Sequence, residues 1–125
     1  MKIGLFDDNT LSWTHLLVEE AEENCIHIRH IFNLSYVGEK DENDGNPFDL
    51  DVLIVNPTLN RVQWKNLLEC VKKNQQVKFI FCLTPQSAED FDLDHFGDFP
   101  NVESYINFDE KYARIKKLFE EALST

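Results

Sequence analysis

Residues 51–57 have the sequence DVLIVNP, and Val52 to Val55 form the most continuous aliphatic run in the chain. A short, wholly aliphatic run is typical of a parallel strand that is buried on both faces of a sheet. Asn56 and Pro57 then end it, because proline has no amide hydrogen to continue the ladder. The run therefore predicts the central strand of a parallel sheet.

Shorter apolar runs on either side predict four further strands. They lie at residues 2–6, 26–32, 77–83 and 102–106. In the second of these, His27, Arg29 and His30 interrupt the isoleucines, and such alternation favours the edge of a sheet.

Between the strands, apolar residues recur at helical spacing. Helices are expected at Leu11–Asn24, with Asn9 or Thr10 as the cap, at Val62–Lys73 and at Lys111–Leu123, and a weak one within 86–96. Trp13 and Trp64 lie on the apolar faces and are interpreted as core residues. Alternating strands and helices predict one α/β domain over residues 1–125, with a parallel sheet between helices.

The charge of the chain excludes some classes of partner. It has 125 residues, with 12 basic and 23 acidic side chains and a net charge of −11. Such a surface repels phosphate backbones and anionic lipid headgroups, so we expect no direct nucleic-acid or membrane-surface binding. The acidity itself is explained by solubility or by a basic protein partner.

Cysteines and histidines do not show the spacing of metal sites. Cys25, Cys70 and Cys82 form no C-x-x-C pair, and their apolar neighbours predict buried free thiols. The four histidines are interpreted as ordinary surface or edge residues: His15, His27, His30 and His95. No apolar run reaches the roughly 18 residues of a membrane span, and no signal peptide follows Met1, so a cytoplasmic protein is expected.

Polar side chains follow three of the expected strands. Asp7 and Asp8 end the first strand, Asn56 ends the third and Thr84 ends the fourth. Because the carboxyl ends of parallel strands share one edge, where ligands bind in such folds, these side chains are expected to converge. Paired carboxylates beside an amide oxygen suit a hard divalent cation such as Mg²⁺.

Four runs carry a resemblance to a known family: KIGLFDDN (2–9), DVLIVNP (51–57), FIFCLTP (79–85) and ESYIN (103–107). Over essentially the whole chain, the sequence resembles the receiver domain of two-component response regulators. The resemblance implies a three-layer α/β/α, flavodoxin-like fold, with a doubly wound five-stranded parallel sheet in the order 2-1-3-4-5. The second helix is expected to be short or lost, because residues 35–49 have the composition of an acidic loop.

The same resemblance implies roles for individual residues. In that family an acidic pair binds magnesium, the third strand ends in the phosphorylated Asp, the fourth ends in Ser or Thr, and the fifth carries a switch aromatic followed by Lys. Position by position, Asp7 and Asp8 match the acidic pair, Thr84 the hydroxyl residue and Tyr105 the switch aromatic.

Two positions depart from the family pattern. Asn56 stands where the phospho-acceptor is expected, and its neutral amide cannot form an acyl phosphate. Phe108 stands where the Lys is expected, and Lys111 is the next basic residue. The resemblance thus implies a pseudo-receiver that is not an enzyme and needs no cofactor, with magnesium bound at most weakly by Asp7 and Asp8.

The function expected of such a pseudo-receiver is phosphorylation-independent signalling through protein contacts, with a partner or as a homodimer. The family's contact surface corresponds to about residues 91–119, where the interface candidates are Phe91, Phe96, Phe99 and Phe108. Exposed rings would mark an interface there, and buried rings would be core. The acidic residues between 39 and 51 are a solvated connection or a contact for a basic partner.

Alternative interpretations stay open. One is a magnesium-binding receiver that is phosphorylated at Asp7 or Asp8. Another is an unrelated flavodoxin-like domain that binds a small ligand at the same edge, although the chain has no Gly-rich phosphate loop. Asp7 and Asp8 are also compatible with simple stabilisation of a helix start, Thr84 with a strand end and Tyr105 with a core aromatic.

Overall fold

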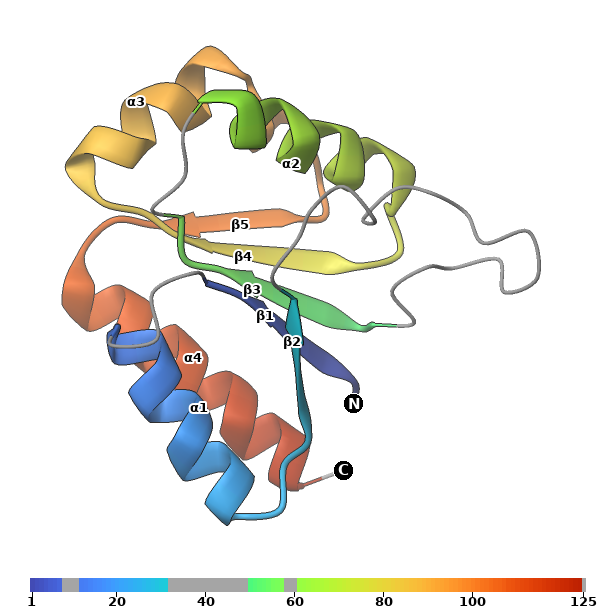
Figure 1. The fold of residues 1–125 in the computed structure, drawn as a ribbon, viewed down its shortest axis with the longest axis vertical. Coiled ribbons are helices and arrows are strands. Elements are labelled where there is room, and N and C mark those ends of the chain that lie inside the picture. The colour runs from blue at the N-terminus through green and yellow to red at the C-terminus, as the bar shows by residue number, and fades with distance from the viewer. Residues whose placement is uncertain (8–11, 32–49, 58–60, 125) are drawn as a thin grey trace.

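The computed structural model of the chain describes residues 1–7, 12–31, 50–57 and 61–124. Its centre is a five-stranded, all-parallel sheet in the order β2-β1-β3-β4-β5 (Figure 1). The strands are β1 (Ile3–Phe6), β2 (Ile28–Ile31), β3 (Val52–Val55), β4 (Lys78–Cys82) and β5 (Val102–Tyr105). The predicted flavodoxin-like α/β fold and its strand order are confirmed, with the aliphatic run of β3 in the middle and β2 at an edge.

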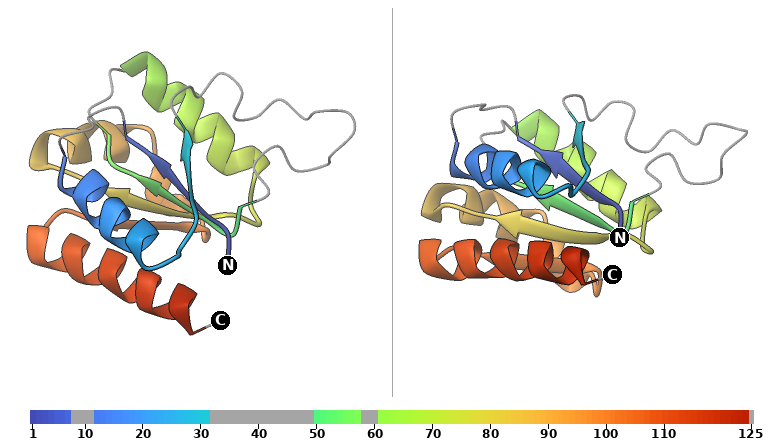
Figure 2. Two further views of the ribbon diagram at one scale, coloured as in Figure 1. Left: turned by 60° about the horizontal axis from the view of Figure 1, so that its bottom comes forward. Right: turned by 90° about the horizontal axis from the view of Figure 1, so that it is seen from below.

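Helices cover both faces of the sheet, which explains why all four residues of β1 and of β3 are buried. On one face lie α1 (Trp13–Glu23) and α4 (Phe108–Leu123), and on the other α2 (Arg61–Lys73) and α3 (Pro85–Leu93) (Figures 1 and 2). A 3₁₀ turn, η2 (Phe96–Asp98), follows α3. Among the described residues, no helix is long and apolar enough to cross a membrane.

Capping residues set where the helices begin, and they correct the predicted boundaries. The helix α1 begins at Trp13 because the Ser12 side chain accepts a hydrogen bond from the His15 amide, so the predicted cap at Asn9 or Thr10 is wrong. The helix α4 begins three residues before the predicted start at Lys111, because the Asn107 side chain accepts from the first turn.

The weakly predicted helix α3 is well formed from Pro85 to Leu93. Thr84 caps it, and Thr84 and Ser87 exchange hydrogen bonds between side chain and backbone as a capping box. Pro85 occupies the first turn, where its missing amide hydrogen costs nothing. These terminal interactions compensate for an acidic sequence of low helix propensity.

Aromatic rings fill the core on the α2–α3 face. Trp64 and Phe81 are 1% and 0% exposed, and the rings of Phe91 and Phe96 stack with centroids 5.1 Å apart. The Phe81 centroid lies 5.2 Å from each of those two rings. The α2–α3 face is therefore a continuous aromatic cluster, in which every ring buries a large apolar area.

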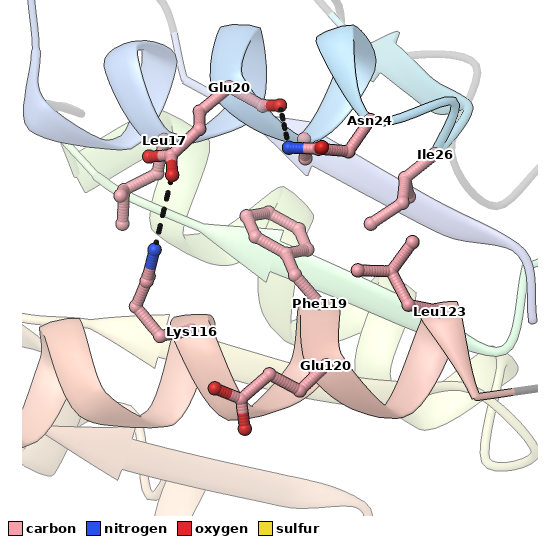
Figure 3. A pocket seen from close by; sticks show the side chains of 9 residues that line it. Leu17, Glu20, Asn24, Ile26, Lys116, Phe119, Glu120 and Leu123 are labelled. Atoms are coloured by element: carbon pink, nitrogen blue, oxygen red, sulfur yellow. Dashed lines mark hydrogen bonds and ion pairs between the residues drawn. The ribbon is translucent and has the colours of Figure 1, made fainter.

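The core on the α1–α4 face is mainly aliphatic. Its buried members come from alternate positions of the strands and from the inner sides of both helices, and include Ile3, Leu5, Leu17, Val18, Ile54, Ile80, Ile115, Leu118 and Phe119. Packing is incomplete at the surface, where a pocket of about 210 Å³ lies between α1 and α4 (Figure 3).

The cysteines divide between core and surface. Cys70 and Cys82 are buried free thiols, as predicted, and burial raises the pKa of each from 9.0 to about 12. Cys25 is exposed, so its predicted burial is wrong. It follows Asn24, the C-terminal cap of α1, and has the left-handed conformation (φ 67°).

The expected acidic loop at 35–49, and with it the short or lost second helix, lies outside the described residues. Asp8 of the expected acidic pair lies outside them as well.

Candidate functional site

The candidate site lies at the carboxyl ends of β1 and β3. These strands are neighbours, with Phe6 opposite Val55, so the next residues, Asp7 and Asn56, emerge side by side. The backbone amide of Asn56 continues the ladder of the sheet by donating to the Phe6 carbonyl at 3.0 Å. Asp7 is 1% exposed, which makes it a buried carboxylate that needs hydrogen-bond donors around it.

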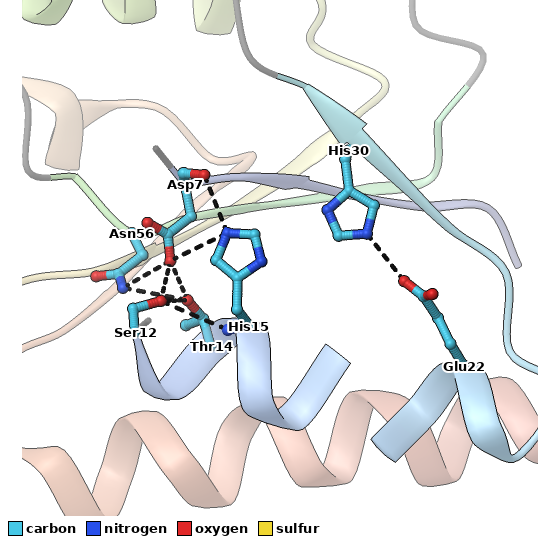
Figure 4. A network of polar contacts seen from close by, with 7 residues as sticks. All are labelled: Asp7, Ser12, Thr14, His15, Glu22, His30 and Asn56. Carbon is cyan, nitrogen blue, oxygen red and sulfur yellow. Dashed lines mark hydrogen bonds and ion pairs between the residues drawn. The ribbon is translucent and has the colours of Figure 1, made fainter. Parts of the chain in front are cut away.

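Three side chains donate to one oxygen of that carboxylate. Asp7 Oδ2 accepts hydrogen bonds from the hydroxyls of Ser12 and Thr14 and from the Asn56 amide, whose Nδ2 lies 3.2 Å away (Figure 4). Asn56 Nδ2 also lies 3.2 Å from Thr14 Oγ1, and the two hydroxyl oxygens are 2.8 Å apart. We call Asp7, Ser12, Thr14 and Asn56 the Asp7 network.

The Asp7 network fixes the start of α1 on the end of β1. Ser12 is both the helix cap and a donor to Asp7, and Thr14 belongs to the first turn. A carboxylate at the amino end of a helix also interacts favourably with the helix dipole. Asp7 thus stabilises the helix start, which was one of the interpretations left open, and it does so through Ser12.

His15 extends the Asp7 network, although it was expected at the surface. It is 8% exposed, and its Nε2 lies 3.1 Å from the Asp7 carbonyl oxygen and 4.0 Å from Asp7 Oδ2. Its ring stacks on that of His30 at 5.7 Å, and His30 Nε2 lies 2.8 Å from Glu22 Oε1. Helical spacing brings His15 inward, since it lies one turn before the buried Val18.

The side chain of a buried lysine on α4 reaches the end of β4, the strand next to β3. Lys111 is 8% exposed, and its Nζ donates to the Leu83 carbonyl at 2.8 Å. Burial has the largest effect on the pKa of Cys82 and raises it. The charge of Lys111 lowers this pKa, and the charge of Asp7 raises it. Lys111 therefore supplies a cation at the carboxyl edge of the sheet, although sequence reasoning treated it as an ordinary helix start.

Thr84 and Tyr105, the other expected site residues that the structure describes, do not join the Asp7 network. Thr84 lies at the same edge of the sheet, but its hydroxyl accepts from the Ser87 amide at 3.1 Å and caps α3. Tyr105, at the end of β5, is half-buried against the α1–α4 core.

The interface candidates separate into core and surface residues. Phe91 and Phe96 are buried in the aromatic cluster, and Phe99 packs against it partly buried. Since buried rings were expected to be core, Phe91 and Phe96 are interpreted as core residues. Phe108 is 52% exposed, and it contacts Trp13 and Tyr112 with ring centroids 5.4 and 6.1 Å away.

The chemistry of the Asp7 network is that of a satisfied carboxylate. Asn56 presents its amide hydrogens to Asp7, where a magnesium site would require an oxygen ligand. The part of the chain that the structure describes contains no group of three His, Cys, Asp or Glu residues able to hold a metal ion. As arranged, the described residues do not fit a magnesium site.

Comparison of the chain with protein-family models, with curated proteins and with solved structures finds no match.

Proposed function

We propose that the chain is a phosphorylation-independent, receiver-like signalling module that acts through protein contacts. The observation that supports this best is the hydrogen bond from Asn56 to Asp7. At the strand end where phosphoryl transfer needs an anionic carboxylate, the chain has an amide, and this amide donates to the neighbouring carboxylate. Asn56 therefore replaces the nucleophile and stabilises the buried Asp7 as well.

Further support comes from the groups around Asn56. A metal bound at Asp7 Oδ2 would have to displace the Ser12 and Thr14 hydroxyls, and the buried Thr14 hydroxyl would lose its acceptor. Lys111, in the first turn of α4, donates a hydrogen bond from its Nζ to the Leu83 backbone carbonyl at 2.8 Å. Both features favour one fixed arrangement of the side chains at these strand ends over an exchange between two such arrangements.

The proposal includes a cytoplasmic location, since reducing compartments keep buried thiols such as Cys70 and Cys82 free. Contact with another protein would supply the signalling role, because Asn56 offers no carboxylate for phosphorylation at the end of β3. We keep a protein partner and a second copy of the chain as the two kinds of contact.

Intact mass spectrometry tests the proposal. The full chain is incubated with acetyl phosphate and MgCl₂, and its mass is compared before and after. We expect no added phosphoryl mass on the natural chain. The variant Asn56→Asp restores a carboxylate at the strand end, and the matched variant Asn66→Asp places the same change on the exposed side of α2.

Any phosphoryl mass on the natural chain would overturn the proposal. If Asp7→Asn then removed that mass, the alternative of a receiver phosphorylated at a non-standard carboxylate would replace it. Uptake by Asn56→Asp without uptake by Asn66→Asp would show that the amide is what prevents the reaction.

A further inference from the structure

The surface formed by α1 and α4 carries exposed aromatic rings at the amino ends of the two helices. Phe108 and Tyr112 on α4 are 52% and 41% exposed, although both are large apolar side chains. Trp13, the first residue of α1, meets the Phe108 ring edge-on at 5.4 Å, so the three rings form one surface across the two helices. Leu16, one turn along α1, is 63% exposed.

Toward the carboxyl ends of the same two helices, the groove between α1 and α4 is the pocket of about 210 Å³ (Figure 3). Its apolar lining comes from both helices and from Ile26, which lies between α1 and β2, and Leu123 in the lining is 59% exposed. The ion pair between Glu20 and Lys116, at 3.3 Å, joins the two helices within this lining. The surface thus combines exposed rings at one end with a pocket of mixed apolar and charged lining at the other.

The surface formed by α1 and α4 is long enough for a helix ligand. The helix α4 runs for 16 residues from Phe108 to Leu123, which is about 24 Å at the rise of an α-helix. An amphipathic helix that lies in such a groove presents apolar anchors every three to four residues. Its anchors would reach the aromatic end and the pocket, while its middle would face the Glu20–Lys116 bridge.

Charge distinguishes between possible occupants. Both helices carry exposed carboxylates, and Glu20 and Glu120 line the pocket itself. The others are Glu19, Glu22 and Glu23 on α1, of which Glu22 pairs with His30, and Asp109, Glu110 and Glu121 on α4. Basic side chains are fewer on these helices: Lys116 and Arg114 are paired with Glu20 and Glu103, and Lys117 is exposed. A second copy of the chain would bring its own net charge of −11 to this acidic surface. A helix bearing Lys and Arg would find complementary charges instead.

We infer that the groove between α1 and α4 binds a basic amphipathic helix of a partner protein, an assignment that rests on the proposed function. Its apolar side contacts the rings of Phe108 and Tyr112 and enters the pocket beside Phe119. Its Lys and Arg side chains meet the carboxylates that flank the groove. The apolar contacts fix the position of the helix, and the charges raise the rate of association.

The probe for this inference is a synthetic helical peptide with Leu on one side and Lys on the other. Its binding to the full chain is followed by Trp13 fluorescence, because Trp64 is 1% exposed and shielded from a ligand, and by amide chemical shifts. We expect shifts confined to α1 and α4, and an affinity that falls as salt is added. A peptide with Glu in place of Lys should not bind.

Two matched variants locate the contact. The double variant Phe108→Ala/Tyr112→Ala should lose at least about tenfold in affinity, as expected when exposed aromatic anchors are removed. Leu93→Ala truncates a side chain on α3 that is 66% exposed, and it should bind like the natural chain. All of these positions are exposed, so the variants should remain folded, which circular dichroism checks.

Several outcomes would overturn the inference. They are shifts centred on α2 and α3, equal affinity in the double variant, equal binding of the Glu peptide, or no binding at all. Self-association of the natural chain that the double variant abolishes would assign the groove to a second copy instead. The proposed function fails separately, through phosphoryl uptake in the mass experiment, so the two failures are distinguishable.

Discussion

The two faces of the sheet use aromatic residues in opposite ways. On the α2–α3 face, Trp64, Phe81 and Phe96 are at most 1% exposed and form the interior of the domain. On the α1–α4 face the core is mainly aliphatic, and the rings of Phe108 and Tyr112 lie outside it. One face therefore stabilises the fold with its rings, whereas the other presents rings to solvent. Large exposed apolar groups that gather in one place are typical of interaction sites.

The largest expected effect comes from breaking the aromatic cluster. Trp64→Ala should lower the free energy of unfolding by about 3–5 kcal/mol, because it leaves a cavity among the rings of Phe81, Phe91 and Phe96. Trp13→Ala, on the other face, should cost about 1 kcal/mol, since Trp13 is half-buried. Denaturant unfolding followed by circular dichroism measures both. Equal losses would contradict the contrast between the two faces.

The next effect concerns the Asp7 network. Asn56→Asp should lower the free energy of unfolding by about 1–3 kcal/mol, because Asp7 loses a donor and gains a neighbouring like charge. Magnesium should recover part of that loss in the variant, since it binds the folded state, and should leave the natural chain unchanged. Thermal unfolding with and without MgCl₂ gives the comparison. Asn66→Asp is the control, and a magnesium effect of similar size there would remove the support for a specific site.

A smaller effect arises from the buried thiols. Burial raises the pKa of Cys70 and Cys82 to about 12, whereas the unfolded thiols titrate near 9.0. The folded state therefore holds protons that the unfolded state releases, so stability is complete below pH 9 and is lost as the pH rises. Linkage gives about 1 kcal/mol per thiol between pH 9 and pH 10.

Comparing Cys70→Ala and Cys82→Ala with the natural chain over that pH range isolates this loss, because each variant should show a shallower decline. The exposed Cys25 provides the control, since Cys25→Ala should leave the slope unchanged. A thiol reagent at neutral pH should modify Cys25 alone in the folded chain. Rapid modification of Cys70 or Cys82 without unfolding would show that these thiols are accessible.

The smallest expected effect sharpens the contrast between the faces. Phe108→Ala should change the free energy of unfolding by no more than about 0.5 kcal/mol, as should Leu93→Ala, because both side chains are more than half exposed. A loss of several kcal/mol for Phe108→Ala would make this ring part of the core. The aromatic surface on α1 and α4 would then be structural.

Much of the fold could be predicted because it depends on local patterns. The run Val52–Val55 placed the central strand, and the polar alternation around His30 placed the edge strand. The helix boundaries were less accurate because they depend on single capping bonds, such as those of Ser12 and Asn107. The helix α3 was underestimated for the same reason, since the Thr84–Ser87 capping box outweighs its weak propensity.

The site was predictable only in part. The strand ends located Asp7 and Asn56, because neighbouring parallel strands place their following residues together. The donors Ser12 and Thr14 were missed, although a Ser before an amphipathic run is a recognisable helix cap. Lys111 reaches the strand end from the first turn of a helix that sequence reasoning began at this residue. The burial of Phe91 and Phe96 was not predictable, since composition alone does not distinguish a buried ring from an exposed one.

The central claim is that Asn56 closes the site by donating to Asp7, and the side-chain amide signals of Asn56 in a ¹⁵N-edited NMR spectrum test it most directly. We predict that these two signals are protected from solvent exchange, lose this protection in Asp7→Ala, and do not move when MgCl₂ and acetyl phosphate are added. Signals that exchange like those of exposed amides, or that shift saturably with magnesium, would contradict the claim.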